Sequence, residues 1–565
     1  MKLGVVGLFF AVVAIGLASC KSDPPDPPAK PPAALHAAGA VLTHHNDNAR
    51  TGQNLAETTL APYNVSADTF GQIGKLVVTG PVDAEPLYVP QLPFNGVPHN
   101  VVFVATEHGF LYAFDADTLG PPLWLASLIP DTEKPSDDHN CAQVTPEIGI
   151  TATPVIDLGY GAHGAIFVVA MSKDATGRYH HRLHALDLVT HAELSGGPVE
   201  IQATYPSHKG TLTFDPGQYE ARSALLLVNG AIYIGWSSHC DVEPYTGWVM
   251  GYSESTLRQT GVLNLTPNGQ AGAIWMSGGG MAADSDGNIF VLDGNGTFDA
   301  AMDSTGMPAS GDFGNAFLRL AADGNGLRVA DYFAAHNTMI NVEQDRDLGS
   351  GGVLLLPDLK DDSGKTRHLA VGAGKADFIT GRPIIYVVDR DAMGKFHGDT
   401  DRAVYQHIET ALGGRDGVFA LPAFFNNTVY YGAQGDFLKA FPIAHARLAE
   451  RSAAHSRTKF TYPGATPSIS ANGAANGIVW AVEASTPGVL HAYDAANLAE
   501  LYNSNQAGGR DQFLENKFIT PMIAGGKVFI GTPDSVAVFG LLGQAPGFSR
   551  DLRPTYHPLG FTGDR

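Results

Sequence analysis

The sequence predicts an all-β protein, an eight-bladed β-propeller whose blades are four-stranded antiparallel sheets. Three observations lead to this fold class. A strand pattern recurs along nearly the whole chain, and 66 glycines without a collagen period indicate a great many turns. The third is the composition: 44% hydrophobic and 16% charged residues are typical of a folded protein with much buried sheet.

The repeat begins with a strand in which an apolar residue precedes an aromatic one, usually followed by another apolar residue. Most copies lead into a second strand like Leu111-Tyr112-Ala113-Phe114-Asp115. Alternating apolar strands joined by short turns, with a period of tens of residues, are typical of propeller blades. Seven copies are explicit: Val102–Val104, Ile166–Val168, Ile232–Ile234, Ile289–Val291, Val429–Tyr431, Val479–Ala481 and Val528–Ile530.

The interval between Phe290 and Tyr430 is too long for one blade, so we place a missing copy inside it. We expect His368–Gly372 as its inner strand and Ile384–Asp389 as the next strand outward. This makes eight blades in one domain, residues 40–565. The Leu-x-Ala-aromatic-Asp ending also resembles the repeat of propellers of the pyrroloquinoline quinone (PQQ) type, which occur in dehydrogenases and in non-enzymatic envelope lipoproteins.

The ring must also close, because an open sheet edge would leave backbone groups unpaired. We expect the N-terminal strand Gly74–Thr79 to pair with the sheet that contains Phe529 and Phe539. Loops between blades are where binding residues should lie, since the strands form a rigid support on which loops converge. The largest insertions are Pro130–Thr151, Gln202–Arg222, Gly296–Gly314 and His336–Gly352.

Residues 1–19 have the pattern of an export signal, with Lys2 ahead of an apolar run too short to span a membrane. Leu17-Ala18-Ser19-Cys20 resembles the lipobox of bacterial lipoproteins, which implies cleavage before Cys20 and lipidation of that cysteine. Lys21 follows it in place of Asp, which favours the outer membrane in a Gram-negative host. We expect an exported protein, anchored to the cell envelope only through its lipid.

Residues 20–39 carry six prolines and are expected to form a semi-rigid tether between the lipid and the propeller. The net charge of −21 would repel a phosphate backbone, which argues against nucleic acid as a partner. A small neutral or cationic ligand, or an envelope protein, is easier to accommodate. We expect a monomer.

With Cys20 lipidated, Cys141 and Cys240 remain, and an exported chain lies where such a pair can oxidise. The sequence leaves open whether they form a disulfide, because their separation in space is not visible in it. No Cys-x-x-Cys-His occurs in the sequence, which excludes covalent c-type haem.

Four motifs with chemical potential follow one another between Trp275 and Arg390. Glycine clusters beside apolar strands usually mark tight turns, so each motif alone is a weak signal, and their order carries more information. They are Trp275-Met276-Ser277-Gly278-Gly279-Gly280, Asp293-Gly294-Asn295-Gly296, Gly311-Asp312-Phe313-Gly314-Asn315, and Gly374-Lys375 ahead of Tyr386-Val387-Val388-Asp389-Arg390.

This order resembles the cofactor-binding part of the quinoprotein alcohol dehydrogenases, which use PQQ and calcium. The resemblance implies Asp312 as the catalytic base, and Lys375, Trp275 and Arg390 as residues at the quinone. It also implies a calcium site at Asn295, completed by Glu243 or Asp241, since calcium prefers oxygen ligands. The family clamps PQQ between a tryptophan just after the triple glycine and a disulfide of adjacent cysteines, and this sequence has neither.

Each of these residues also has a structural interpretation. Asp312 and Asn295 lie in glycine-rich turns, where such side chains commonly bond the local backbone. Lys375 suits a solvated strand end, and Trp275 suits a packed core. His44, His45 and Asp47 carry metal-ligand side chains, but without further ligands in the sequence a metal site there is the less favoured interpretation.

Two functions remain from the sequence. One is an envelope oxidoreductase similar to the PQQ alcohol dehydrogenases, acting on a small alcohol or sugar. The other is a non-catalytic propeller that serves as a scaffold or binding protein of the envelope. Fold alone does not separate them, because one propeller supports both kinds of function. A deep polar axial pocket lined by Asn295, Asp312 and Lys375 would favour the enzyme.

Overall fold

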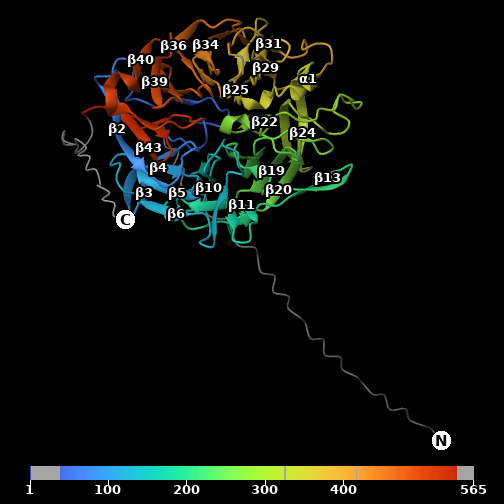
Figure 1. The fold of residues 1–565 in the computed structure, drawn as a ribbon, viewed down its shortest axis with the longest axis horizontal. Coiled ribbons are helices and arrows are strands. Elements are labelled where there is room, and N and C mark those ends of the chain that lie inside the picture. The colour runs from blue at the N-terminus through green and yellow to red at the C-terminus, as the bar shows by residue number, and fades with distance from the viewer. Residues whose placement is uncertain (2–37, 324–325, 415, 544–565) are drawn as a thin grey trace, which may run out of the picture.

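The structure is a computed structural model that describes Met1 and residues 38–323, 326–414 and 416–543. Eight antiparallel sheets stand around a central axis as the blades of one ring, which confirms the predicted fold class (Figure 1). The expected signal peptide, Cys20 and most of the expected tether lie outside the described residues. Within the described residues, no helix is both long enough and apolar enough to cross a membrane.

Blades 1 to 4 follow one another in the first part of the chain, each starting with the strand nearest the axis. From the axis outward, blade 1 is β3 (Leu87–Phe94), β4 (Val97–Ala105), β5 (Phe110–Asp115) and β6 (Trp124–Ser127); blade 2 is β9 (Val155–Asp157), β10 (Ala165–Asp174), β11 (Tyr179–Asp187) and β12 (Val199–Glu200); blade 3 is β16 (Leu226–Val228), β17 (Ala231–Gly235), β19 (Trp248–Ser253) and β20 (Gln259–Asn264); blade 4 is β21 (Ala282–Ala283), β22 (Ile289–Leu292), β23 (Phe317–Asp323) and β24 (Gly326–Ala334).

Blades 5 to 8 complete the ring in the same order. Blade 5 is β25 (Val353–Leu355), β28 (Leu369–Gly372), β29 (Ile385–Asp389) and β31 (Gln406–Ile408); blade 6 is β32 (Ala423–Phe425), β33 (Thr428–Gly432), β34 (Asp436–Ala444) and β36 (Ala454–Phe460); blade 7 is β37 (Ser468–Asn472), β38 (Ala475–Glu483), β39 (Val489–Asp494) and β40 (Glu500–Asn503); blade 8 is β41 (Met522–Ala524), β42 (Lys527–Gly531), β43 (Ser535–Leu541) and β2 (Phe70–Val77).

The predicted repeat strand is the second strand from the axis in every blade. The copy placed in the long interval is β28, followed outward by β29 as expected, while β25 forms the strand nearer the axis. Strand β2 closes the ring by pairing antiparallel with β43, with Gly74 opposite Val538 and Leu76 opposite Val536. The expected N-terminal closure is confirmed, and the strand begins at Phe70, four residues before the predicted start.

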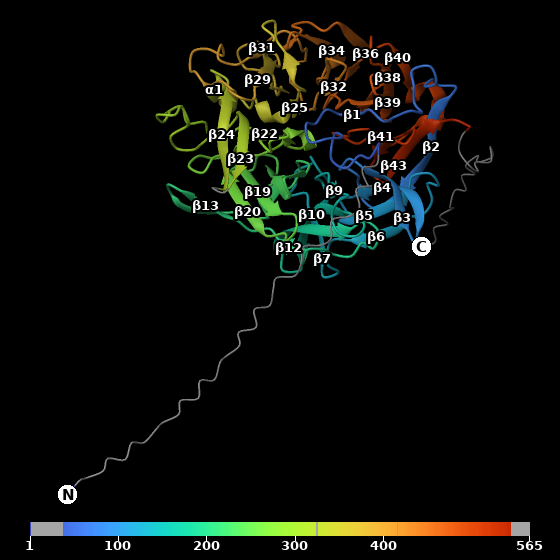
Figure 2. The ribbon, with the colours of Figure 1, turned by 180° about the vertical axis from the view of Figure 1, so that it is seen from behind.

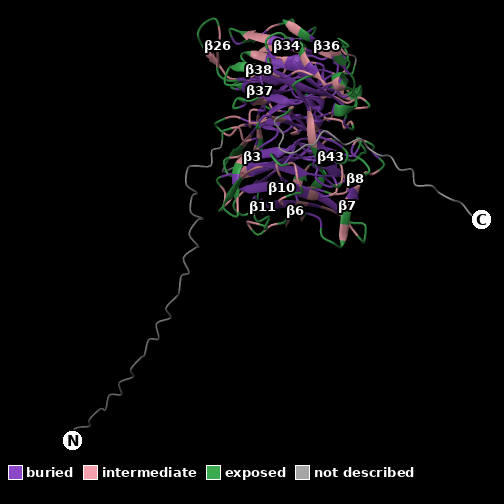
Figure 3. Ribbon diagram, turned by 90° about the vertical axis from the view of Figure 1, so that its left-hand side faces the viewer, coloured by how far each residue is buried: buried purple, intermediate pink, exposed green. Residues whose placement is uncertain are grey.

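The blades pack face to face, so both faces of a middle strand are buried. Strand β10 shows the consequence, because its first eight residues are all buried. Ile166 and Val168 pack with residues of blade 1, whereas Phe167 and Val169 pack with residues of blade 3. Successive side chains on a strand point to opposite faces, which explains why the repeat carries apolar residues at consecutive positions. Figure 3 shows this buried interior between the exposed loops.

The predicted insertions form small elements at the blade junctions. Pro130–Thr151 contains β7 (Glu133–Asp137) and β8 (Glu147–Ile148), and Gln202–Arg222 contains the hairpin of β13 (Thr204–Ser207) and β14 (Gly210–Thr213). His336–Gly352 contains α1 (Thr338–Glu343), the one α-helix of the described residues, and the 3-10 turn η2 (Leu348–Ser350). The other short elements are β15 (Tyr219–Glu220), β18 (Ser237–Ser238), η1 (Met276–Gly278), β26 (Leu359–Lys360), β27 (Thr366–Arg367), β30 (Lys395–Phe396), β35 (Arg447–Leu448) and η3 (Ser504–Asp511).

A segment ahead of the first blade, residues 41–54, crosses the middle of the ring and contacts the innermost strand of every blade. We call it the axial segment, and Figure 2 shows it in blue, with β1 (Gln53–Asn54), across the centre. In blades 1 and 7 it forms strand pairings, Val41 with Tyr88 and β1 with β37. In blades 2 to 8 it forms hydrogen bonds with Ile156 N, Leu227 O, Ala283 N, Leu355 N, Phe424 N, Ile469 N and Ile523 O.

Arg50 fixes the axial segment through a fully buried guanidinium. Its Nε donates to Met281 O at 2.9 Å, its Nη1 to Thr43 Oγ1 at 2.7 Å, and its Nη2 to Leu225 O at 3.2 Å. Burial lowers the pKa of Arg50 to about 10, while the negative charges of Asp47 and Glu85 raise it. A buried charge is tolerated when its hydrogen bonds are made, and here backbone carbonyls of two blades supply them.

Candidate functional site

A cavity of about 120 Å³ lies where the loops of the seven junctions from blades 1–2 to blades 7–8 converge. We call it the axial cavity, because loops from so many blades meet only near the axis of the ring. Three of the four predicted insertions contribute to it, through Gln143, Arg222 and Asp347, and Gly296–Gly314 does not. Its lining residues are Gln143, Arg222, Cys240, Asp241, Trp275, Ser277, Asp347, Ser350, Lys375, Phe419, Tyr462 and Phe518.

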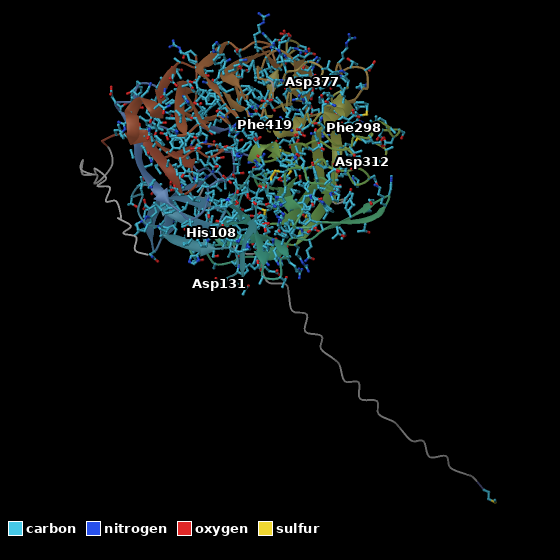
Figure 4. The ribbon with its side chains drawn as sticks, in the orientation of Figure 1. His108, Asp131, Phe298, Asp312, Asp377 and Phe419 are labelled. Atoms are coloured by element: carbon cyan, nitrogen blue, oxygen red, sulfur yellow. A yellow bond between two sulfur atoms is a disulfide. The ribbon has the colours of Figure 1, made fainter. Side chains whose placement is uncertain are left out.

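Four aromatic side chains line the axial cavity. The ring centroids of Phe419 and Tyr462 are 5.5 Å apart, those of Tyr462 and Phe518 are 5.8 Å apart, and both pairs meet edge to face. Figure 4 labels Phe419 near the middle of the ring. Trp275 packs on Gly294, where an added Cβ would lie 2.7 Å from the indole Cδ1. Such rings offer flat faces and edges on which a bound ring can stack.

Lys375 and Asn295, two of the predicted site residues, meet in one charge network beside the cavity. Lys375 Nζ lies 2.6 Å from Asp345 Oδ1 and 2.8 Å from Asp347 Oδ2. Asn295 donates its backbone N–H to Asp347 Oδ1 at 2.7 Å and its Nδ2 to Asp345 Oδ1 at 2.8 Å. Burial lowers the pKa of Lys375, but attraction to Asp347 and Asp345 outweighs it and raises the pKa above its usual value.

Asp312 does not line the axial cavity. Its Oδ1 accepts the backbone N–H groups of Asn268 at 2.8 Å and Gly269 at 3.1 Å, and its Oδ2 accepts from Ser310 Oγ at 2.8 Å. The carboxylate therefore ties the β22–β23 loop of blade 4 to the loop between blades 3 and 4. Figure 4 labels Asp312 toward the rim of the ring and Phe419 near its middle.

The other predicted residues are divided between the cavity and its surroundings. Trp275 and Asp241 line the cavity, and Asp241 Oδ1 accepts from Tyr245 Oη at 2.6 Å. Glu243 is exposed and accepts from Gln270 Nε2 at 3.1 Å. Arg390 is buried away from the cavity, where its guanidinium lies 3.5 Å from Asp284 Oδ2 and over the Phe290 ring.

Cys141 and Cys240 form a disulfide, with a Cα–Cα distance of 5.7 Å. Cys240 lines the axial cavity, so the disulfide and Trp275 border the same space. The bridge joins the Pro130–Thr151 insertion of blade 2 to the β18–β19 loop of blade 3. The rings of His139 and His239 stack beside it with centroids 4.0 Å apart.

Arg222, which the sequence did not single out, has an unusual position in the cavity wall. Arg222 is 6% exposed, and its guanidinium carbon lies 4.8 Å from the centroid of the Phe518 ring. Across the described part of the chain, no hydrogen bond or ion pair engages this guanidinium. The nearby Glu220 carboxyl is buried, which raises its pKa to about 7, while the charge of Arg222 lowers it.

A second, smaller cavity of about 30 Å³ adjoins the first and shares Gln143, Arg222 and Phe518 with it. Its wall includes His44, which belongs to the axial segment, and Glu85, which does not. The distance between Glu85 Oε2 and His44 Nε2 is 3.6 Å. Burial raises the pKa of Glu85 to about 8, and burial lowers the pKa of His44 well below its usual value. Arg222 therefore lines both spaces.

The residues present do not fit calcium. Among the described residues, no group of three or more His, Cys, Asp and Glu side chains is arranged to hold a metal ion. Asp345 and Asp347, the carboxylates beside Asn295, already share the Lys375 ammonium. His45, which the sequence placed among metal-ligand side chains, has its two ring nitrogens 2.8 Å from Arg50 O and 2.9 Å from Pro467 O.

Comparisons with known protein families and with curated proteins find no match to this sequence. Solved structures do match. The quinohemoprotein alcohol dehydrogenase ADHIIG from Pseudomonas putida HK5 aligns with a TM-score of 0.59 at 14% identity, over 91% of this chain and 82% of that one. A europium-containing methanol dehydrogenase aligns with a TM-score of 0.56 at 12% identity, over 90% of this chain and 99% of that one. BamB from Moraxella catarrhalis aligns at 11% identity over 83% of this chain and 99% of that one, but its TM-score of 0.45 is too low to support a conclusion. The chain thus has the eight-bladed propeller fold of the quinoprotein alcohol dehydrogenases.

Proposed function

We propose that this chain is an exported, lipid-anchored propeller that binds a small ring-shaped ligand in the axial cavity. The observation that carries the proposal is the convergence of seven blade junctions on one space lined by four aromatic side chains and seven polar or charged ones. Small-molecule sites are typically concave, with aromatic walls that a ligand packs against and polar groups that set its orientation. Trp275, Phe419, Tyr462 and Phe518 supply the flat surfaces.

The disulfide supports the exported location. Disulfides persist in oxidising compartments such as the periplasm and the cell surface. The Cys141–Cys240 disulfide agrees with the export signal and the lipobox that the sequence of residues 1–20 predicts. A Cys20→Ala variant tests the anchor: it should move from the membrane fraction to the soluble envelope fraction. A variant that stays in the membrane fraction would contradict a lipid anchor at Cys20.

The second candidate is a quinone-dependent oxidoreductase, the function suggested by the fold likeness. The observation that favours it is that Trp275, Lys375 and the disulfide border a single cavity. It ranks second for three reasons. The carboxylate of Asp312 is occupied in a loop contact away from the cavity. No three His, Cys, Asp or Glu side chains of the described ranges are grouped to hold a metal ion. The volume of about 120 Å³ is below the roughly 300–1,000 Å³ of drug-sized ligand sites.

Thermal melting of the full-length protein in detergent tests both candidates, because a ligand that binds the folded state raises the midpoint. A panel of ring compounds, aromatic acids, sugars and PQQ with and without calcium, is expected to yield at least one rise that is lost in Trp275→Leu. No rise with any member would overturn binding at the cavity. A rise with PQQ that needs calcium and is lost in Lys375→Ala would move the oxidoreductase to first place.

A further inference from the structure

We propose that Arg222 is an anion-recognition residue and that the ligand of the axial cavity is a ring compound bearing a carboxylate. This rests on the proposed binding function and names the chemical class of its ligand. The starting observation is that a guanidinium in a residue only 6% exposed has no hydrogen bond or ion pair with any residue the structure describes. Arginine carries five N–H donors in a planar fork that matches a carboxylate.

Burial without partners is costly for a charged group, so the unpaired guanidinium of Arg222 points to a partner from outside the chain. Arg50 provides the contrast within the same protein, because its buried guanidinium donates to Met281 O, Thr43 Oγ1, His44 O and Leu225 O. Arg222 instead lines both cavities and donates no hydrogen bond to any residue that the structure describes. A cation in the wall of a cavity that binds no anion is expected to pair with carboxylates of the chain itself. Lys375 does so with two of them.

Aromatic rings lie beside the Arg222 guanidinium. The Arg222 guanidinium carbon lies 4.8 Å from the centroid of the Phe518 ring, and a cation–π contact of this kind restrains the guanidinium without using its N–H donors. Tyr462 and Phe419 continue the aromatic wall from Phe518. An anion bound at the edge of the fork therefore lies beside flat apolar surfaces, which suits a ring attached to the anionic group.

The charge around the cavity selects a carboxylate over a phosphate. Asp241 lines the same wall and makes no ion pair with any described residue, so a dianion would be repelled more strongly than a monoanion, which is matched by the single unpaired guanidinium. The space of about 120 Å³ also limits the ligand to one small ring. Arg222 is thus a local positive site in a chain whose net charge of −21 led us to expect a neutral or cationic ligand.

Paired probes on the full-length protein test the proposal by calorimetric titration. Benzoate is compared with benzamide, and galacturonate with galactose, so that each pair differs in the carboxylate and shares the ring. We expect the carboxylate of at least one pair to bind tenfold or more tightly than its neutral partner. Arg222→Gln should abolish that preference, and Arg222→Lys, which keeps the charge and loses the fork, should retain part of it.

Equal affinity for both members of each pair, binding of no carboxylate, or an unchanged preference in Arg222→Gln would each overturn the proposal. Binding of the neutral rings alone, lost in Trp275→Leu, would leave the binding function standing and remove only the role of Arg222. Inorganic phosphate is included as a further probe, and its binding in preference to the carboxylates would overturn the ligand class. The melting midpoint of Arg222→Gln without ligand shows whether the variant is folded.

Discussion

The guanidinium of Arg50 lies against Gly280, where an added Cβ would be 2.5 Å from Nη2 and 2.8 Å from Cζ. The last glycine of the Gly278-Gly279-Gly280 motif thus makes room for the axial segment. Arg50 has little freedom to withdraw, because its hydrogen bonds reach carbonyls on both sides of the motif. This contact links the triple glycine to the axial segment, which touches all eight blades.

Gly280→Ala should therefore destabilise the whole ring. The extra methyl group must displace a buried, hydrogen-bonded guanidinium, and overpacking of this kind costs about 1–3 kcal/mol. Urea unfolding of the full-length protein measures the loss. Gly509→Ala is the matched control, because nothing lies within 4 Å of a Cβ there, and it should stay within about 1 kcal/mol of the parent. Equal stability of the two variants would contradict the proposed contact.

The fold could be predicted because the same strand pattern is repeated in every blade. Both faces of the second strand are buried between neighbouring blades, so apolar residues occupy consecutive positions and the copies can be counted. The closure of the ring followed from the need to pair the last sheet edge. The axial segment could not be predicted, since its contacts join residues far apart in the sequence: His45 bonds Pro467, 422 residues away.

The site could be predicted only in part, for a related reason. Long insertions mark the loops that reach the axis, and three of the four carry cavity residues. Phe419, Tyr462 and Phe518 are single aromatic residues in three different blade junctions, and they meet only after the ring has closed. The Arg222 guanidinium lacks a partner among the described residues because no acceptor lies near enough in space. The sequence does not show which groups lie near one another in the folded chain.

Removal of the disulfide should weaken the protein and its cavity wall together. Cys141 and Cys240 are 99 residues apart, and cross-links that close loops of this size typically contribute about 2–5 kcal/mol. The double variant Cys141→Ser/Cys240→Ser should unfold at lower urea concentration than the parent. The parent in reducing buffer should approach the double variant, which itself should not respond to the reductant. A parent that keeps its full stability when the bond is reduced would contradict this expectation.

Lys375→Gln should cost stability in a way that depends on pH. The variant leaves the buried Asp347 carboxyl without its ammonium partner, and the pKa of Asp347 is already raised by burial. Removing one partner of a buried ion pair typically lowers the free energy of unfolding by about 3–5 kcal/mol, because the other charge stays buried and unpaired. Because a raised pKa means that the folded state binds a proton more readily, the loss should be largest near pH 8 and shrink toward pH 4 as Asp347 protonates.

Urea unfolding across that range measures the effect. The double variant Lys375→Gln/Asp347→Asn removes both charges and keeps hydrogen-bonding groups in place. It should therefore be more stable than Lys375→Gln at pH 8 and show a flatter profile. A deficit of the same size at every pH in Lys375→Gln would mean that Lys375 acts through packing and not through charge.

Glu85 should make the protein less stable as the pH rises. Burial raises the pKa of Glu85 from 4.5 to about 8, while the His45 backbone N–H and Arg50 lower it. Between these two values the folded state holds a proton that the unfolded state has released. The stabilising contribution is therefore complete below about pH 4.5 and is lost as the pH rises through about 8. His44 and His45 act in the opposite direction, since burial lowers the pKa of each below 6.5 and their contribution is lost on acidification.

Glu85→Gln separates the alkaline decline from the acid decline in the dependence of stability on pH. A glutamine oxygen can accept the His45 backbone N–H, which Glu85 Oε2 accepts at 2.8 Å, and it carries no charge at any pH. Urea unfolding at pH 5, 6.5, 8 and 9 should show that the variant loses the alkaline decline, a difference of a few kcal/mol at pH 9, and keeps the acid decline. The exposed Glu450→Gln should reproduce the parent at every pH. If Glu85→Gln declines between pH 6.5 and 9 as steeply as the parent does, another group controls the alkaline decline and Glu85 is ionised in the folded protein at neutral pH.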